Sequence, residues 1–147
     1  MQFLRIKGKL VYYMIKKLKI SSDLENLRIV EKEIDDITVS ANISHTHYGG
    51  ILVAVLEAVN NAIEHGNKFS SEKFVNISLK FAKDKFSVVV KDEGLGFSPE
   101  NVPDPTLPEN IEKIRGRGIF LMMKLADEIK FNKKGNSVTL VFNNIVS

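Results

Sequence analysis

The amino-acid sequence predicts an α+β fold, a two-layer sandwich in which about three helices cover one face of a mixed, mostly antiparallel sheet. Two observations support this fold class. Three stretches carry apolar residues at helical spacing, and the stretches around them alternate apolar and polar residues or form short β-branched runs. The predicted order is strand, two helices, two strands, long loop, helix and two strands. Short turns join most neighbouring strands, which favours antiparallel pairing.

The first half of the chain is predicted to form one strand and two helices. "MIKKLKI", residues 14–20, is the first strand, and "SSDLENLRIVEKEIDDI", residues 21–37, is the first helix. The second helix runs from about Tyr48 to His65 and ends at Gly66, because glycine is the usual residue after a helix C-terminus. The apolar residues of the first helix recur at helical spacing, at Leu24, Leu27, Val30, Ile34 and Ile37.

The second half is predicted to form a hairpin, an irregular loop, a helix and a final hairpin. Residues 73–83 alternate apolar and polar side chains, as a half-buried strand does, and residues 85–93 follow after a short turn. The loop over residues 94–118 contains all four prolines of the chain, which lack the backbone donor that helices and strands use. The remaining predicted elements are a helix over residues 118–129 and strands over residues 129–134 and 137–145.

Composition limits the classes of protein to which the chain can belong. Its 147 residues suit one domain, and the absence of cysteine excludes disulfide and thiolate chemistry. No apolar run reaches the roughly 18 residues of a membrane-spanning helix. Lysines also interrupt the N-terminal region, where an export signal would be uninterrupted. We therefore expect a cytoplasmic protein that does not bind membranes.

The N-terminal region carries the excess positive charge. Residues 1–19 contain six basic residues and no acid, so the net charge of +3 for the chain leaves −3 for the remainder. We interpret residues 1–13 as a basic N-terminal extension, either disordered or, if Met14 is the true start, not native. Residues 14–147 form the folded domain. Because the basic residues gather in this tail and not on the folded body, we expect no direct binding of nucleic acid.

A polar stripe in the second predicted helix is the first candidate site. Glu57, Asn61 and His65 are spaced by four residues and therefore lie on one side of the helix. A carboxylate and a carboxamide one turn apart suit Mg²⁺, which prefers oxygen ligands and is usually shared with substrate phosphates. Glu57 could also accept a proton from a hydroxyl group or from water. The alternative is a solvated helix face, with His65 as a capping or surface residue.

The second candidate is "KDEGLGF", residues 91–97, which follows a β-branched run. Asp92 then stands at the end of a strand, and Gly94 and Gly96 let the backbone turn tightly and let a ligand approach closely. A buried aspartate can accept a hydrogen bond from the exocyclic amine of adenine. Taken alone, the motif is equally typical of an ordinary strand-to-loop turn.

The third candidate is "IRGRGIF", residues 114–120, in which Gly116 and Gly118 bracket Arg117 immediately before the third predicted helix. Backbone amides at a helix N-terminus form an anion site. Arg115 and Arg117 add cationic donors that suit phosphate oxygens. The spacing matches neither the P-loop nor the dinucleotide-binding fingerprint, and alone this motif is weak.

Together, and in this order, the three motifs resemble those of the GHKL ATPase superfamily, which covers gyrase-type, chaperone, histidine-kinase and mismatch-repair ATPases. "EAVNNAIEHG" resembles its N box, "DEGLGF" its first glycine box and "RGRGI" its second, and the proline-rich segment resembles its ATP lid. The resemblance spans about residues 15–145 and implies the Bergerat-type ATP-binding fold. The short chain and the N-box phrase look most like the anti-sigma-factor serine/threonine kinases.

The resemblance implies a role for each matching residue, with ATP and Mg²⁺ as cofactors. Glu57 matches the general base that activates the acceptor serine or a water, Asn61 matches the Mg²⁺ ligand, and Asp92 matches the carboxylate that reads adenine. The remaining matches are Gly94 and Gly96 beside the base, Arg115 as a phosphate-contacting lid arginine, and Gly116 and Gly118 as the phosphate-binding helix entry.

The third nucleotide box departs from the family pattern. The family commonly has a threonine after a glycine near the last hairpin, where it contacts adenine. This chain has "KKGNSVTL", so Asn136 or Ser137 takes that place.

The implied function is that of a kinase that phosphorylates a small anti-anti-sigma protein on serine or threonine and binds a sigma factor; such kinases are often homodimers. Two alternatives stay open at this point. One is a nucleotide-gated interaction module that transfers no phosphate. The other is the ATPase piece of a split two-component histidine kinase.

Overall fold

The computed structural model describes residues 2–96 and 114–147, and its main feature is a six-stranded sheet. The strand order is β1-β2-β3-β4-β6-β5, and each pairing between neighbours is antiparallel. The strands are β1 (Gln2–Ile6), β2 (Lys9–Ser21), β3 (Phe74–Ala82), β4 (Lys85–Lys91), β5 (Glu128–Phe131) and β6 (Ser137–Asn143).

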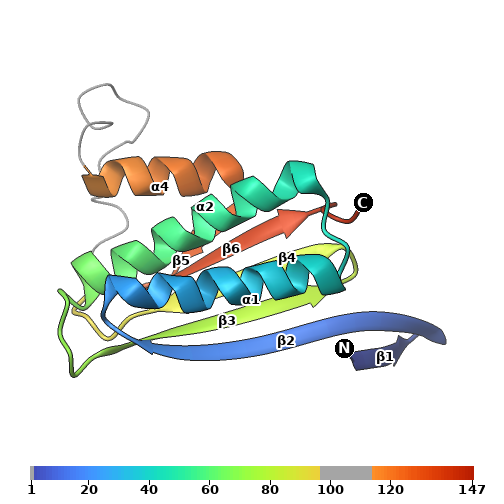
Figure 1. Ribbon diagram of the computed structural model, residues 1–147, viewed down its shortest axis with the longest axis horizontal. Coiled ribbons are helices and arrows are strands. Elements are labelled where there is room, and N and C mark those ends of the chain that lie inside the picture. The colour runs from blue at the N-terminus through green and yellow to red at the C-terminus, as the bar shows by residue number, and fades with distance from the viewer. Residues whose placement is uncertain (1, 97–113) are drawn as a thin grey trace.

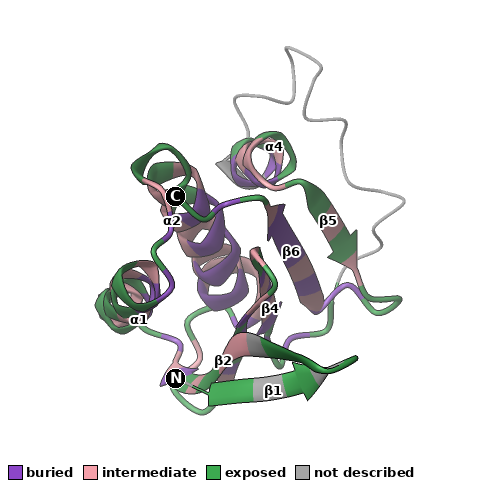
Figure 2. Ribbon diagram, turned by 90° about the vertical axis from the view of Figure 1, so that its right-hand side faces the viewer, coloured by how far each residue is buried: buried purple, intermediate pink, exposed green. Residues whose placement is uncertain are grey.

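Helices cover one face of this sheet. They are α1 (Leu27–Ser40), α2 (His45–Asn61) and α4 (Ile114–Leu125), with α2 between the other two (Figure 1). A 3-10 turn, η1 (Leu24–Asn26), precedes α1, and a π-helical turn, η2 (Ala62–Gly66), extends α2. Viewed from the side, no described helix lies on the other face of the sheet (Figure 2). The predicted two-layer α+β fold is therefore confirmed.

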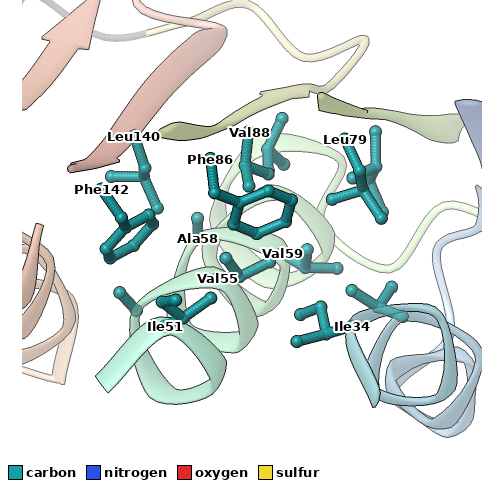
Figure 3. Close-up of a cluster of buried hydrophobic side chains, with 14 of the residues drawn as sticks. Ile34, Ile51, Val55, Ala58, Val59, Leu79, Phe86, Val88, Leu140 and Phe142 are labelled. Carbon is teal, nitrogen blue, oxygen red and sulfur yellow. The ribbon is translucent and has the colours of Figure 1, made fainter. Parts of the chain in front are cut away.

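The core lies between the helices and the sheet. The alternation predicted for the third strand is observed, because every second side chain of β3 is buried. The register places Phe86 and Val88 of β4 opposite Phe81 and Leu79 of β3, on the same face. Figure 3 shows such side chains pointing toward those of α2 and α1. Each fully buried aliphatic or aromatic side chain stabilises the fold by about 1.5–3 kcal/mol, so this layer holds the sheet and helices together.

The first predicted strand is longer than expected and has an unpredicted neighbour. β2 begins at Lys9, five residues before Met14, and β1 pairs with its first half. The pairing of Tyr13 with Ala82 and of Met14 with Phe81 shows that β2 runs without a break across the predicted boundary at residue 13. The structure places residues 2–6 and 9–13 in these two strands, whereas the domain boundary itself stays a prediction.

The interpretation that the basic residues form a tail apart from the folded body is wrong for the lysines of β2. Lys17 and Lys19 pair with Ser78 and Asn76 of β3 in the middle of the sheet. The physical reason is that a strand with one buried face carries its lysines on the opposite face, so alternating basic residues need not indicate a disordered segment.

The third predicted helix is shifted toward the N-terminus. α4 runs from Ile114 to Leu125 instead of residues 118–129. Its C-terminal end is set by the sheet, because the amide of Asp127 donates to the Val141 carbonyl at 2.8 Å and Glu128 already belongs to β5. The predicted loop over residues 94–118 lies mostly outside the described residues.

No helix in the described part of the chain combines the length and the apolar composition that a membrane crossing requires.

Candidate functional site

The end of α2 presents the first two predicted site residues. Glu57 and Asn61 are half-buried and lie one turn apart. After Asn61 the helix widens into η2, in which the amide of Asn67 donates to the Ala62 carbonyl at 2.8 Å. Such π turns occur often at functional sites. The α-helix therefore ends at Asn61. His65 lies in the π turn, so it does not follow Glu57 and Asn61 at the regular α-helical spacing that the prediction assumed.

Gly118 of α4 lies directly against these two side chains. A Cβ atom at Gly118 would stand 2.8 Å from Glu57 Oε2 and 3.3 Å from Asn61 Nδ2. The first distance is shorter than a normal carbon–oxygen contact, so only glycine fits while Glu57 stays in place. This contact brings the predicted N box and the predicted second glycine box together.

Asp92 lies just beyond β4 and is buried, with 9% of its surface exposed. Its Oδ1 accepts a hydrogen bond from the amide of Gly94 at 2.8 Å. A Cβ atom at Gly66 would overlap the Asp92 carboxylate, and one at Gly94 would overlap the Gly66 carbonyl. A carboxylate offers about four acceptor positions, so the bond from Gly94 is compatible with a further donor from a ligand.

A pocket between α2, α4, β4 and the β5–β6 turn connects these elements. Asn61, Asp92 and Ser137, three of the predicted site residues, line it. Met122 and Ile119 of α4 are among the apolar residues of its wall. The enclosed space is about 30 Å³, enough for one or two water molecules. A purine ring is larger than this space, and the pocket is partly open to solvent.

The turn between β5 and β6 holds Asp92 from the other side. The amide of Asp92 donates to the Asn136 carbonyl at 2.9 Å, and Asn136 Nδ2 donates to the Asp92 carbonyl at 3.2 Å. Asn132 stabilises this turn, because its Oδ1 accepts from the amides of Gly135, Asn136 and Ser137. The sequence placed Asn136 or Ser137 at this site but missed Asn132; two asparagines around a glycine were the available signal.

Asn67 is a second residue that sequence reasoning missed. It is 1% exposed, and its Oδ1 accepts from the amide of Glu93 at 2.8 Å. Its Nδ2 donates to Ser22 Oγ at 2.9 Å and to the Phe74 carbonyl at 3.1 Å. Asn67 thereby ties the loop after Asp92 to the ends of β2 and β3. A buried asparagine cannot be told from a surface one by its neighbours in sequence alone.

The glycine–arginine segment is helical throughout. Gly116 and Gly118 are buried and Arg117 is exposed, while Arg115 lies in the first turn of α4. Because α4 begins at Ile114, Gly118 lies in its second turn and not at its first residue, and its role in binding phosphate stays a prediction. The amides of the first turn, including that of Gly116, have no partner within the helix and could donate to an anion.

Gly96, the second glycine of the first box, has a φ of +81°, and a Cβ atom there would overlap the Lys134 carbonyl. It therefore brings the end of the first glycine box against the β5–β6 turn. Like Arg117, it is exposed and does not line the pocket.

Residues 20–142, most of the chain, match the histidine kinase-like ATPase domain. The chain belongs to this family. The predicted resemblance is thereby confirmed. Asp92, Glu57, Asn61 and Gly118 all lie within the matched residues.

Among curated proteins, this ATPase domain is similar to serine-protein kinases. It is 26% identical to the serine-protein kinase RsbW of Oceanobacillus iheyensis over 124 residues, which cover 80% of this chain and 78% of that protein. It is also 26% identical to the serine-protein kinase RsbW of Staphylococcus epidermidis over 133 residues, which cover 85% of this chain and 84% of the relative.

Two solved structures share the fold. The RsbU and RsbW domains of a Mycobacterium tuberculosis protein superpose with a TM-score of 0.63 at 17% identity, over 88% of this chain and 32% of that one. The histidine kinase domain of a blue-light activated histidine kinase from Erythrobacter litoralis gives a TM-score of 0.50 at 19% identity, over 83% of this chain and 59% of that one. This ATPase domain thus spans about a third of the first chain and somewhat over half of the second.

Proposed function

We propose that the chain is an ATP-binding serine/threonine protein kinase of the anti-sigma-factor type. It phosphorylates a small anti-anti-sigma protein and binds a sigma factor. The observation that carries the proposal is that Asn61 touches two places at once. It lies beside Gly118 and Glu57, since a Cβ atom at Gly118 would stand 3.3 Å from Asn61 Nδ2, and it lines the same pocket as the buried Asp92. The names of the curated relatives, which are serine-protein kinases, support a hydroxyl group as the acceptor.

The proposal places the nucleotide along this line of residues. The adenine amine donates to the Asp92 carboxylate, and Ser137 and Asn136 lie beside the base. The phosphates lie near Asn61 and the first turn of α4, where the amides of that turn and the guanidinium groups of Arg115 and Arg117 serve as donors. Gly94 and Gly96 shape the loop next to the base.

The donor set fits a magnesium ion that is shared with phosphates. The described residues contain no group of three or more histidine, cysteine or carboxylate side chains that could hold a metal ion. Mg²⁺ usually takes only one or two protein ligands and completes its coordination with phosphate oxygens and water. Asn61 would be that ligand, and Mg²⁺ bound there would neutralise charge on the transferred phosphoryl group.

Glu57 then acts on the acceptor. Its carboxylate accepts the proton of the serine or threonine hydroxyl while the hydroxyl oxygen bonds to the γ-phosphorus and the bond to the β–γ bridging oxygen breaks. The products are a phosphorylated partner and ADP. Glu57 Oε2 lies beside Gly118, so its carboxylate stands next to the part of α4 where the proposal places the phosphates.

The test begins with the partner and continues with variants. Pull-downs from native lysate with the tagged protein and Mg-ADP or Mg-ATP identify the partner. The partner is then incubated with the protein and Mg-ATP, and its phosphorylated residue is mapped by mass spectrometry. We expect phosphate on one serine or threonine. Glu57→Ala should lower the rate by about 10²–10⁴-fold while Mg-ATP still raises its melting temperature. Glu31→Ala, the same change at an exposed carboxylate of α1, serves as the matched control.

Asp92→Asn tests the other end of the pocket. It should weaken ATP binding, because a carboxamide presents a donor where the adenine amine also donates. Unchanged ATP affinity in this variant, or undiminished transfer by Glu57→Ala, overturns the assigned roles. Phosphate on histidine indicates a two-component kinase, and no transfer over hours indicates a nucleotide-gated module.

A further inference from the structure

The face of the sheet that carries no described helix is rich in lysine. The register of β2, β3, β4, β6 and β5 places their outward side chains in rows across the sheet. One row joins Lys19, Asn76 and Lys91, and the next joins Lys17, Ser78, Val89 and Thr139. We call this surface the lysine face; its six lysines are Lys17, Lys19, Lys80, Lys85, Lys91 and Lys130, and all are exposed.

Among the described residues, few carboxylates lie near the lysine face; one is that of Glu93, which accepts a hydrogen bond from the Phe74 amide at its edge. Among the outward strand residues of these rows the one carboxylate is that of Glu128. The ion pairs within the described residues join Lys16 to Glu33 and Lys32 to Asp36, on the helix side. Strands lie about 4.8 Å apart, so neighbouring lysines fall within about 10 Å of one another and repel across a Debye length of about 8 Å. Such a surface binds negative charge favourably.

The centre of the lysine face is shallow and partly apolar. Ser78, Ser87, Val89 and Thr139 occupy neighbouring positions of β3, β4 and β6 and are half-buried. A depression of about 220 Å³ opens there, with Lys17 and Lys91 among its lining residues. Exposed Ile15 adds apolar surface beside it. The centre is thus a low floor of small side chains, three with hydroxyl groups and one valine, between basic side chains.

The residue types of the lysine face limit which kinds of ligand it can bind. Its cations are all lysines, and Tyr13 and Phe74, its aromatic residues, lie near opposite ends of β2 and β3. Sequence-tolerant nucleic-acid sites offer open aromatic faces among the cations so that bases can stack. Here Lys19 Nζ already lies over the Phe74 ring, 4.5 Å from its centroid, and the depression at the centre has no aromatic residue in its lining. Two copies meeting face to face would oppose lysine against lysine, and like charges disfavour that pairing.

We propose that the lysine face binds an acidic, amphipathic segment of another protein. Apolar side chains of that segment would lie on Val89 and its neighbours, and its carboxylates would pair with lysines on both sides of the depression. This surface lies on the opposite side of the sheet from α2 and α4, so it is separate from the nucleotide pocket (Figure 2).

The test uses a designed peptide as the probe. A fluorescent helix of glutamate and leucine, about five turns long with leucine along one side, is titrated with the full chain and followed by anisotropy. We expect saturable binding that weakens as NaCl rises, and a loss of about tenfold or more in Lys17→Glu/Lys91→Glu. The matched control Arg28→Glu/Lys124→Glu makes the same charge change on the helix side and should change affinity less than about twofold.

A second variant and two other ligands distinguish the proposed peptide binding from the alternatives. Lys80→Glu/Lys130→Glu gives a second reversal on the lysine face, for the event that the first variant fails to fold by circular dichroism. Equal binding by face and control variants overturns the proposal. Tighter binding of oligothymidylate, or of vesicles with roughly equal phosphatidylserine and phosphatidylcholine, also overturns it, in favour of nucleic acid or membrane. Peptide binding should be unchanged in Asp92→Asn, so its outcome is independent of the proposed kinase activity.

Discussion

Gly66 lies so close to Asp92 that a Cβ atom on the glycine would overlap the aspartate carboxylate. The last residue of η2 and the first residue after β4 therefore form a single contact, although 26 positions separate them in the chain. Because Gly94 in turn lies against the Gly66 carbonyl, the N box and the first glycine box are mutually dependent.

Gly66→Ala should damage both stability and nucleotide binding. The new methyl group must displace Asp92 or the backbone, and such overpacking costs typically about 1–3 kcal/mol of the free energy of unfolding. Urea denaturation and ATP titration measure the two effects. The control is Gly49→Ala in α2, where a Cβ atom meets nothing within 4 Å. That change should stabilise by about 0.5–1 kcal/mol, and equal behaviour of the two variants would contradict the contact.

Gly118→Ala should act mainly on activity. The added Cβ would stand 2.8 Å from Glu57 Oε2, the far end of a flexible side chain, which can move away at little cost in stability. The displaced carboxylate should then transfer phosphate more slowly, by about tenfold or more, with ATP affinity changed less. Gly50→Ala is the matched control, since its Cβ would make an ordinary 3.5 Å contact with Leu125. A full rate in Gly118→Ala argues against the placement of Glu57.

Asn67 should stabilise the fold, and its side chain should need to be uncharged. Asn67→Ala removes three hydrogen bonds and leaves the Glu93 amide without its acceptor, at a cost of about 1–3 kcal/mol. Asn67→Asp keeps that acceptor but buries a carboxylate against Ser22 Oγ and the Phe74 carbonyl. It should be the more destabilising change at neutral pH and less so in acid. Chemical denaturation at two pH values checks this order, and the reverse order at neutral pH would be incompatible with the described geometry.

Tyr48 should make the fold less stable in strong alkali. Its hydroxyl donates to Asp35 Oδ1, and this hydrogen bond, with burial and the nearby carboxylates, raises the pKa of Tyr48 from 10.0 to about 12. The folded-state pKa exceeds the unfolded one, so the contribution is fully present below pH 10 and is lost as pH rises through about 12.

Tyr48→Phe checks this assignment. The variant should show a shallower fall in unfolding free energy between pH 10 and about 12 than the wild type. Part of the slope should remain, because burial also raises the pKa of Tyr12. Identical pH profiles for the two proteins would show that the Asp35 contact does not hold the Tyr48 proton.

The sequence-based prediction succeeded where short-range pattern decides structure. The alternation in β3, the helical spacing in α1 and the glycine after η2 all reflect local propensity and the burial of one face. These determine the type and approximate place of most elements. The three motifs likewise depend on neighbouring residues, which is why the family could be inferred before the fold was known.

Contacts between residues far apart in the chain decided the features that the sequence pattern did not predict. α4 ends at Leu125 because β6 takes up the following backbone, and β1 exists because β2 offers it an edge. Asn67 and Asn136 are site-shaping residues only because they are buried against Asp92 and Glu93. Hydrogen-bond partners that lie 26 and 44 positions apart leave no periodic trace in the sequence.

The sequence by itself thus determined the fold class and the family and predicted the residues of a nucleotide site, since local propensity and motif spacing carry that information. Only the tertiary structure decided that Gly118 meets Glu57 and that Gly66 meets Asp92. It also decided that lysines from four strands share one face. The physical reason is that strand register and helix packing, which no single segment specifies, determine which side chains become neighbours.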